Sequence, residues 1–176
     1  MIRVSKFFIN CVASLALVAA CGIMSSCVGG DSNVDITEVN KVTGPQSHKE
    51  KEQELLRLMN QVRRQKGRKP LVIDPRLTRA AQAHSNSMYK HNYFAHEGKD
   101  GSDFSKRMLR EDYPRCYSSE NLAIAFSPSH ANRLWLNSSG HRKNLLGARY
   151  TRVGIGIKGK YWTANYAEPM GPIGGN

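Results

Sequence analysis

Cysteine is scarce in this chain, and the positions of the few cysteines exclude a disulfide-stabilised domain. Of the 4 cysteines among 176 residues, Cys11, Cys21 and Cys27 lie near the N-terminus and only Cys116 lies further along. A domain that begins after residue 27 therefore has no internal disulfide and depends on its apolar core for stability. Because Cys116 has no Cys-x-x-Cys companion, we interpret it as a small buried or half-buried side chain.

Long apolar runs are also missing. The longest, Phe7–Ala20, is too short to span a bilayer comfortably as a helix, which takes about 20 apolar residues. Arg3 and Lys6 precede this run and small residues follow it, which is the anatomy of a secretory signal peptide. We therefore predict a signal peptide over residues 1–26 and an exported protein.

Two cysteines lie where the signal peptide of a lipoprotein would be cut. The segments "VAAC", ending at Cys21, and "IMSSC", ending at Cys27, both resemble the bacterial lipobox, whose cysteine is acylated. The alternatives are lipidation of Cys21, lipidation of Cys27, or a plain cleaved signal peptide. Residues 27–48 lack helical or strand periodicity and contain Gly, Pro, Ser and Asn, which predicts a flexible linker. A lipid-anchored protein in the bacterial cell envelope, held to a membrane by its N-terminal lipid, is the expected arrangement.

Acidic residues are few relative to basic ones. The chain has 26 Lys and Arg against 14 Asp and Glu, and removal of Arg3 and Lys6 leaves a net charge of +10. Such a domain is expected to associate with anionic surfaces such as lipid headgroups or cell-wall polymers. Aromatic and basic residues do not alternate as in a base-stacking platform, so no specific nucleic-acid partner is predicted.

Helical and strand periodicities are both present after residue 48, with no internal repeat. Helices are expected over 49–66, from Pro75 to about 91 with Asp74 as N-cap, over 102–111, and from 128 to about 138, where Gly140 would end the helix. In the third of these, Phe104, Met108 and Leu109 are expected to face inward. Residues 120–126 are ambiguous between a strand and a helical turn. Segments 151–158 and 161–168 alternate as a two-stranded hairpin. Helices followed by a closing hairpin predict an α+β domain over 49–176, with a sheet covered by helices.

Four segments, in order, resemble the CAP superfamily of cysteine-rich secretory, antigen 5 and pathogenesis-related proteins. They are "LMNQVRRQKGRKPLVIDPRLTRAAQAHSNSMYKHNYFAHEG", "SENLAIA", "WLNSSGHRKNLL" and "RYTRVGIGI". The likeness is to the bacterial, SCP-like branch and covers about residues 52–168. It implies a three-layer α-β-α sandwich with a central antiparallel sheet.

The resemblance also implies a cleft lined by histidines and acids. By position, His96 and Glu120 fall in that cleft and His141 matches a histidine of the bacterial branch. Two eukaryotic cleft residues are replaced, because a histidine falls on Arg149 and an acid falls on Ser138. The full eukaryotic set of two histidines and two acids is therefore absent.

The neighbours of these residues suggest supporting roles. Asn121, Arg142 and Asn144 are candidate ligand contacts, and the last two could instead bond backbone carbonyls around a turn that carries His141. Glu120 could alternatively form an ion pair with Arg142 or Arg149. His84 is on the inward face of its helix and is interpreted as a core histidine.

Two histidines and a carboxylate permit three kinds of chemistry. His96, Glu120 and His141 could bind zinc or another divalent metal with an open position, act as general acid and base on a water-mediated hydrolysis, or hold a ligand headgroup. Their spacing matches no local metal motif, and no Gly-x-Ser-x-Gly nucleophile elbow is present. The first hypothesis is a binding module for a ligand or metal. The second is a hydrolase of peptide or cell-wall bonds, and the third is adhesion to anionic surfaces.

Overall fold

The computed structural model describes residues 46–168, and all of its secondary structure lies in the compact unit Gly44–Asn176. The predicted signal peptide, both lipobox cysteines and nearly all of the predicted linker lie outside the described residues. Within 46–168, no helix combines the length and apolar character that a membrane crossing requires.

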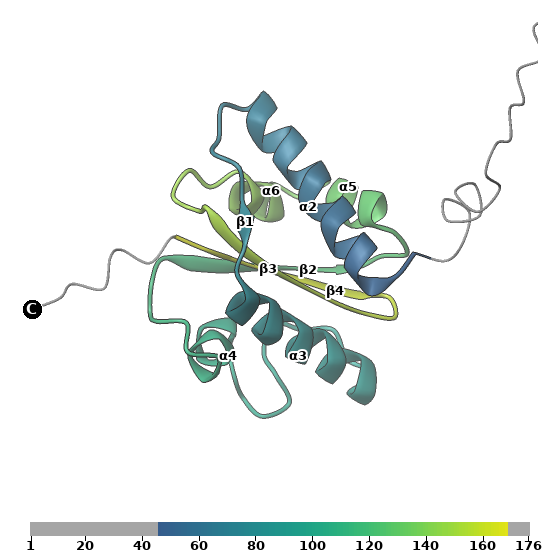
Figure 1. The fold of residues 1–176 in the computed structure, drawn as a ribbon. Coiled ribbons are helices and arrows are strands. Elements are labelled where there is room, and N and C mark those ends of the chain that lie inside the picture. The colour runs from purple at the N-terminus through teal and green to yellow at the C-terminus, as the bar shows by residue number, and fades with distance from the viewer. Residues whose placement is uncertain (1–45, 169–176) are drawn as a thin grey trace, which may run out of the picture. The chain divides into compact units, whose positions relative to one another are not determined.

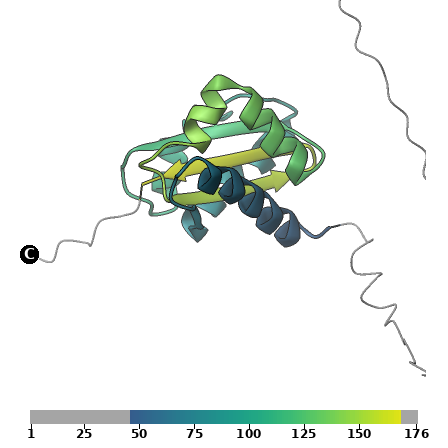
Figure 2. The ribbon, with the colours of Figure 1, turned by 90° about the horizontal axis from the view of Figure 1, so that it is seen from above.

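The described elements form three layers, as Figure 1 shows. The helices are α2 (His48–Gln65), α3 (Pro75–His91), α4 (Phe104–Arg110), α5 (Pro128–Asn137) and α6 (Ser139–Leu145). The strands are β1 (Val72–Ile73), β2 (Ser118–Ile124), β3 (Arg152–Lys158) and β4 (Tyr161–Ala167). Helices α3 and α4 cover one face of the sheet, and α2, α5 and α6 cover the other (Figure 1). Figure 2 looks down on the second helical layer, with α2 and α5 lying over the strands.

The sheet has the order β1-β3-β4-β2. Strands β3 and β4 form the predicted hairpin, and β2 pairs antiparallel to β4, so 120–126 is mainly strand. The two-residue strand β1 pairs with β3 in parallel. The predicted α+β sandwich is therefore confirmed, and its sheet is mixed because β1 adds a short parallel edge to three antiparallel strands.

Local sequence explains where the helices begin. Each is preceded by a side chain that accepts a hydrogen bond from its first turn, which satisfies an otherwise unpaired N–H: these caps are Ser47, Asp74, Asp103, Ser127 and Ser138. Ser138 corrects one expectation, since it ends α5 and caps α6, and Gly140 lies inside α6. A second correction concerns Leu109, which is 36% exposed and does not face inward.

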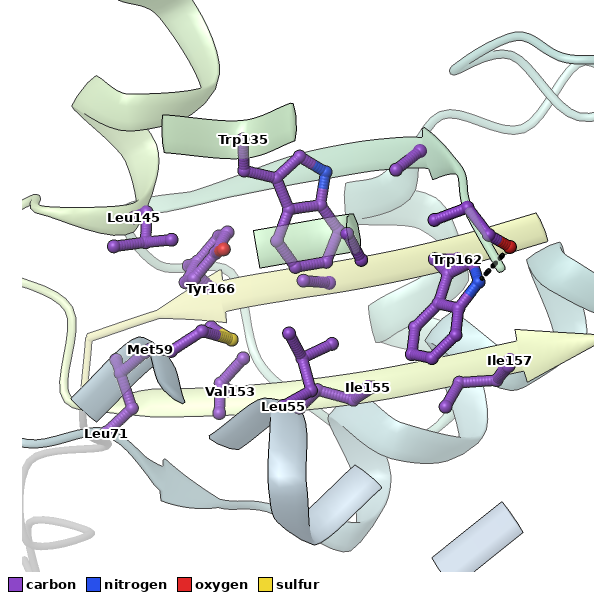
Figure 3. Close-up of a cluster of buried hydrophobic side chains, with 14 of the residues drawn as sticks. Leu55, Met59, Leu71, Trp135, Leu145, Val153, Ile155, Ile157, Trp162 and Tyr166 are labelled. Carbon is purple, nitrogen blue, oxygen red and sulfur yellow. Dashed lines mark hydrogen bonds between the residues drawn. The ribbon is translucent and has the colours of Figure 1, made fainter. Parts of the chain in front are cut away.

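The main core lies between the sheet and the layer of α2, α5 and α6. Figure 3 shows Leu55 and Met59 of α2 and Trp135 of α5 packed on side chains of β3 and β4. Both indole N–H groups find carbonyl acceptors, because Trp135 Nε1 donates to Leu122 O at 3.0 Å and Trp162 Nε1 donates to Ala125 O at 2.8 Å. These bonds let two large aromatic side chains be buried without an unpaired donor.

On the opposite face, two glycines of β3 let α3 lie directly on the sheet. A Cβ on Gly154 would lie 2.0 Å from the carbonyl carbon of Leu77, and one on Gly156 would lie 2.3 Å from that of Ala81. No side chain fits in that space. The "VGIG" segment thus sets the distance between α3 and the sheet.

Arg63 is a buried arginine that links several distant segments of the backbone. Its side chain is fully buried and donates to the carbonyl oxygens of Lys69, Leu145, Gly147 and Tyr150 at 2.6–3.2 Å. Burial lowers the pKa of this guanidinium. Arg63 thereby joins the end of α2 to the last residue of α6 and to the segment between α6 and β3.

Candidate functional site: the imidazole site

The predicted site residues come from three separate segments and meet at the edge strand β2. Along β2, alternate side chains point to opposite faces of the sheet. Leu122 packs on the α3 face with Met88, and Ala123 packs in the main core. Glu120 shares the face of Leu122, and Asn121 shares the face of Ala123. We call His96, Glu120 and His141 the imidazole site.

The Glu120 carboxylate is buried and has a partner at each oxygen. His96 Nδ1 lies 2.9 Å from Oε1, and Arg107 Nη2 lies 2.8 Å from Oε2. The Glu120 side chain is 0% exposed, whereas that of His96 is 58% exposed. Glu120 therefore fixes the ring of His96 through Nδ1 and leaves Nε2 on the opposite, outward side of the ring. The ion pair weighed for Arg142 or Arg149 is formed by Arg107 instead.

Arg107 of α4 is the residue of the candidate site that the sequence prediction missed. Its side chain is 6% exposed, and besides Glu120 it donates to Ser102 O at 2.7 Å and His96 O at 3.0 Å. It therefore holds both the carboxylate and the backbone of the loop that carries His96. One signal pointed to it, because Arg107 follows the inward Phe104 by three residues and so falls on the buried face of α4.

His141 reaches the site from α6 and not from a turn. It is the third residue of the helix, and its backbone N–H donates to Ser138 Oγ at 3.5 Å. Burial lowers the pKa of His141, and the proximity of His96 lowers it further. His141 is therefore a neutral imidazole near neutral pH, able to donate at one ring nitrogen and accept at the other.

The three predicted ligand contacts have structural partners. Asn121 Nδ2 donates to His141 O at 2.9 Å, and Asn144 Nδ2 donates to Asn121 Oδ1 at 2.9 Å. Arg142 Nη1 donates to Leu136 O at 2.7 Å, which joins α6 to the end of α5. Asn121 and Asn144 thus fix α6 against β2 and set the position of His141. A direct role of these three residues in ligand binding stays a prediction.

The edge of β2 is covered beside the site. Asn144 Nδ2 lies 3.4 Å from Glu120 O, and Trp135 Nε1 donates to Leu122 O. These side chains occupy two carbonyls of an edge strand, which would otherwise be available to pair with another chain.

The donor set fits a zinc site poorly. No group of three or more His, Cys, Asp or Glu side chains within residues 46–168 is placed to hold a metal ion. Both oxygens of Glu120 already bond His96 and Arg107. The site therefore offers two imidazoles, one fewer than the three protein ligands of known catalytic zinc sites.

Other residues behave as interpreted from the sequence. His84 is 1% exposed, and its Nε2 lies 2.9 Å from Ala95 O, so it is a core histidine whose pKa is lowered by burial. Cys116 is half-buried, and burial raises the pKa of its thiol, which disfavours the reactive thiolate. A cavity of about 290 Å³ lies between α3, α4 and the loop 98–102, with Arg107 in its wall.

The α-β-α sandwich, with a buried acid and an exposed histidine paired at its edge strand, agrees with what the resemblance to CAP proteins implies. Residues 56–166 match the Cysteine-rich secretory protein family, CAP, and the chain belongs to this family.

Two relatives with similar sequences are bacterial proteins. The chain is 34% identical over 130 residues to the uncharacterized protein YkwD of Bacillus subtilis, and 34% identical over 118 residues to the uncharacterized membrane protein YlbC of the same organism. These matches cover 70% and 66% of this chain but only 49% and 34% of the relatives. The chain thus spans about half the length of one relative and a third of the other.

Solved structures show the same fold. An extracellular SCP-domain protein of Bacillus anthracis superposes with a TM-score of 0.65 at 29% identity, covering 72% of this chain and 45% of that one. An outer surface protein of Borrelia burgdorferi superposes with a TM-score of 0.64 at 18% identity, covering 71% of this chain and 97% of that one. The second likeness is one of fold alone.

Proposed function

We propose that this protein is an exported, envelope-tethered binding module whose imidazole site takes a ligand through His96 and His141. The observation that carries the proposal is the Glu120 carboxylate, which is 0% exposed and bonds His96 on one side and Arg107 on the other. A ring oriented in this way presents Nε2 at a fixed position before any ligand arrives. Such preorganisation reduces the ordering cost of binding.

The tether is supported by the sequence and by relatives. Two lipobox-like cysteines, Cys21 and Cys27, lie at the end of the predicted signal peptide and directly after it. The similar proteins include one described as extracellular and one described as a membrane protein. Mass spectrometry of the mature N-terminus would test the tether in wild type, Cys21→Ser and Cys27→Ser. One of the two substitutions should abolish the acyl mass and release the protein from the membrane. An unacylated wild-type N-terminus would refute the tether and leave a plain cleaved signal peptide.

A hydrolase is the second candidate, and the same hydrogen bond favours it. A carboxylate that fixes Nδ1 of an imidazole also prepares Nε2 to accept a proton from water, as in general-base catalysis. In this reading His96 is the base, Glu120 holds its orientation and His141 contacts the substrate. The reaction class would be hydrolysis of peptide or cell-wall bonds.

Native mass spectrometry of the protein purified from its own envelope tests the first candidate. We expect extra mass on the wild type that is lost in the His96→Ala/His141→Ala double variant. The matched control is His91→Ala, because His91 is an exposed histidine at the end of α3, outside the imidazole site. A wild-type mass with nothing beyond the N-terminal acyl group, or non-covalent extra mass kept by the double variant, would contradict the binding module.

A turnover assay and a metal titration separate the hydrolase and the metal site from the binding module. Turnover of labelled casein or purified murein that vanishes in His96→Gln, but not in His91→Gln, would establish the hydrolase. Calorimetry with Zn²⁺ alone addresses the metal. Because the described residues supply two imidazoles and no third ligand, we expect weak binding that depends on His96 and His141 together.

A further inference from the structure

Several exposed aromatic side chains gather at one end of the domain, around the turn between β3 and β4. Tyr89 of α3 is 54% exposed, Phe94 of the following loop is 47% exposed, and Phe126 between β2 and α5 is 79% exposed. With Lys158 at the end of β3 and Lys160 of the turn they form a set that we call the hairpin rim. None of these residues belongs to the imidazole site.

Contacts between neighbouring segments show that the rim is continuous. Ala125 N donates to Lys160 O at 2.8 Å, which places the adjacent Phe126 beside the turn. The ring of Phe94 lies 6.4 Å from that of Tyr161, the first residue of β4. Lys158 Nζ lies 5.4 Å from the ring centre of Tyr89.

The charge of the rim is positive. Lys158 and Lys160 are exposed, and Lys90 adds another exposed cation beside Tyr89. The rim itself contains no acidic residue, and Glu97, three positions after Phe94, is the acid nearest to it in the sequence. Aromatic rings mixed with lysines match the chemistry of the bilayer interface, where amphipathic rings sit at headgroup level and cations meet anionic lipid.

The chain enters the domain at the same end. His48 and Lys51, in the first turns of α2, line a groove together with Lys158 and Gly159 of the turn. Figure 1 shows the dark blue start of α2 beside the yellow β3–β4 turn. The segment that precedes Ser47 therefore joins the domain next to the hairpin rim.

We propose that the hairpin rim docks on the surface of an anionic lipid bilayer. Phe126, Tyr89 and Phe94 enter the headgroup region, and Lys158 and Lys160 meet lipid phosphates. The point of chain entry favours a membrane over a soluble partner, because an N-terminal lipid anchor would bring this end of the domain to the bilayer. The docking is independent of what the imidazole site binds.

Vesicle co-sedimentation of the domain Gly44–Asn176 tests the proposal. This segment contains every described element and every core cluster of the described residues, and it leaves out the apolar leader. We expect binding to phosphatidylglycerol-containing vesicles and much weaker binding to pure phosphatidylcholine. Lys158→Gln/Lys160→Gln should weaken binding by about 25-fold, at about fivefold per lysine, and Phe126→Ser by about tenfold.

Matched controls remove the same groups elsewhere. Lys66→Gln/Lys69→Gln removes two exposed lysines beyond the far end of α2, about 27 Å from its start for an 18-residue helix. Tyr117→Ser removes a 49% exposed ring at the other end of β2. Both controls should change vesicle binding less than threefold, and circular dichroism should show all variants folded.

Three outcomes would overturn the proposal. Equal losses in rim and control variants would mean diffuse attraction by the net charge. Rim-dependent binding of soluble dextran sulfate as strong as that of vesicles would mean a polyanion site. Rim-dependent self-association in sedimentation without vesicles would mean that a second copy of the chain covers the rim.

Discussion

The buried ion pair of Arg107 and Glu120 is expected to contribute strongly to the stability of the fold. The two side chains are 6% and 0% exposed, so water screens neither charge. Removing one partner of such a pair leaves the other charge buried without compensation, at about 3–5 kcal/mol. We compare Arg107→Met, Glu120→Gln and the double variant by urea unfolding.

The two single substitutions differ in what they leave behind. Arg107→Met leaves the Glu120 carboxylate with His96 alone and also removes the donors to Ser102 O and His96 O. We expect a loss of about 4–5 kcal/mol, a large share of the 5–15 kcal/mol typical of a whole domain. Glu120→Gln leaves Arg107 its two carbonyl acceptors, so about 2–3 kcal/mol is expected.

The double variant measures the coupling energy between Arg107 and Glu120. If the pair acts as a unit, the double variant should lose at least about 2 kcal/mol less than the sum of the singles. The control is the exposed pair of Arg79 and Glu111, with side chains 56% and 28% exposed, for which Arg79→Met should cost under about 1 kcal/mol. Additive losses, or equal effects at Arg107 and Arg79, would refute the reasoning that the pair is a buried unit.

Three further predictions use the same unfolding assay. Gly156→Ala should lower the free energy of unfolding by about 3 kcal/mol because its Cβ would overlap the backbone of α3. A Cβ on Gly140 would meet no atom within 4 Å, so Gly140→Ala should leave stability unchanged or raise it. Equal effects of the two substitutions would contradict this reasoning. Arg63→Met should lower the free energy of unfolding by about 4 kcal/mol because buried carbonyls lose their donor. Arg63→Lys should not recover the lost stability. The lowered pKa values of His84 and His141 mean that the unfolded chain binds more protons below pH 6.5. Stability should therefore be full above that pH and fall as the pH drops below it, and histidine NMR titrations should show both midpoints below 6.5.

Local signals in the sequence were sufficient for most of the fold. Asp74-Pro75 and Ser127-Pro128 each place a cap and a proline at a helix start, and the alternation of 151–168 predicts the hairpin. The error at Gly140 has a local cause. Glycine commonly follows the end of a helix, but here Ser138 caps a new helix through its own side chain, and Gly140 lies in that first turn.

The partners of the two buried arginines could not be predicted from local sequence patterns. In the sequence, Arg63 is one cation among several at the end of α2. In the structure it donates hydrogen bonds to the carbonyl oxygens of Leu145 and Tyr150, more than 80 positions away. Arg107 meets Glu120 and the backbone of His96 only once α4 and β2 are assembled. The helical spacing from Phe104 indicates that Arg107 is buried, but no pattern of neighbours in the sequence names the distant groups that pair with either arginine.

The same distinction separates the members of the site from the residues that position them. The family resemblance predicted His96, Glu120 and His141 as site residues from short motifs, and the structure brings these segments together at one edge of the sheet. It does not follow that every polar residue of a motif contacts a ligand. Asn121 and Asn144 join α6 to β2, and Arg107, outside the matched motifs, holds both Glu120 and the loop of His96. Substitutions at His96 should therefore alter binding with little loss of stability, whereas substitutions at Arg107 should alter both, because Arg107 holds Glu120 and the backbone of His96.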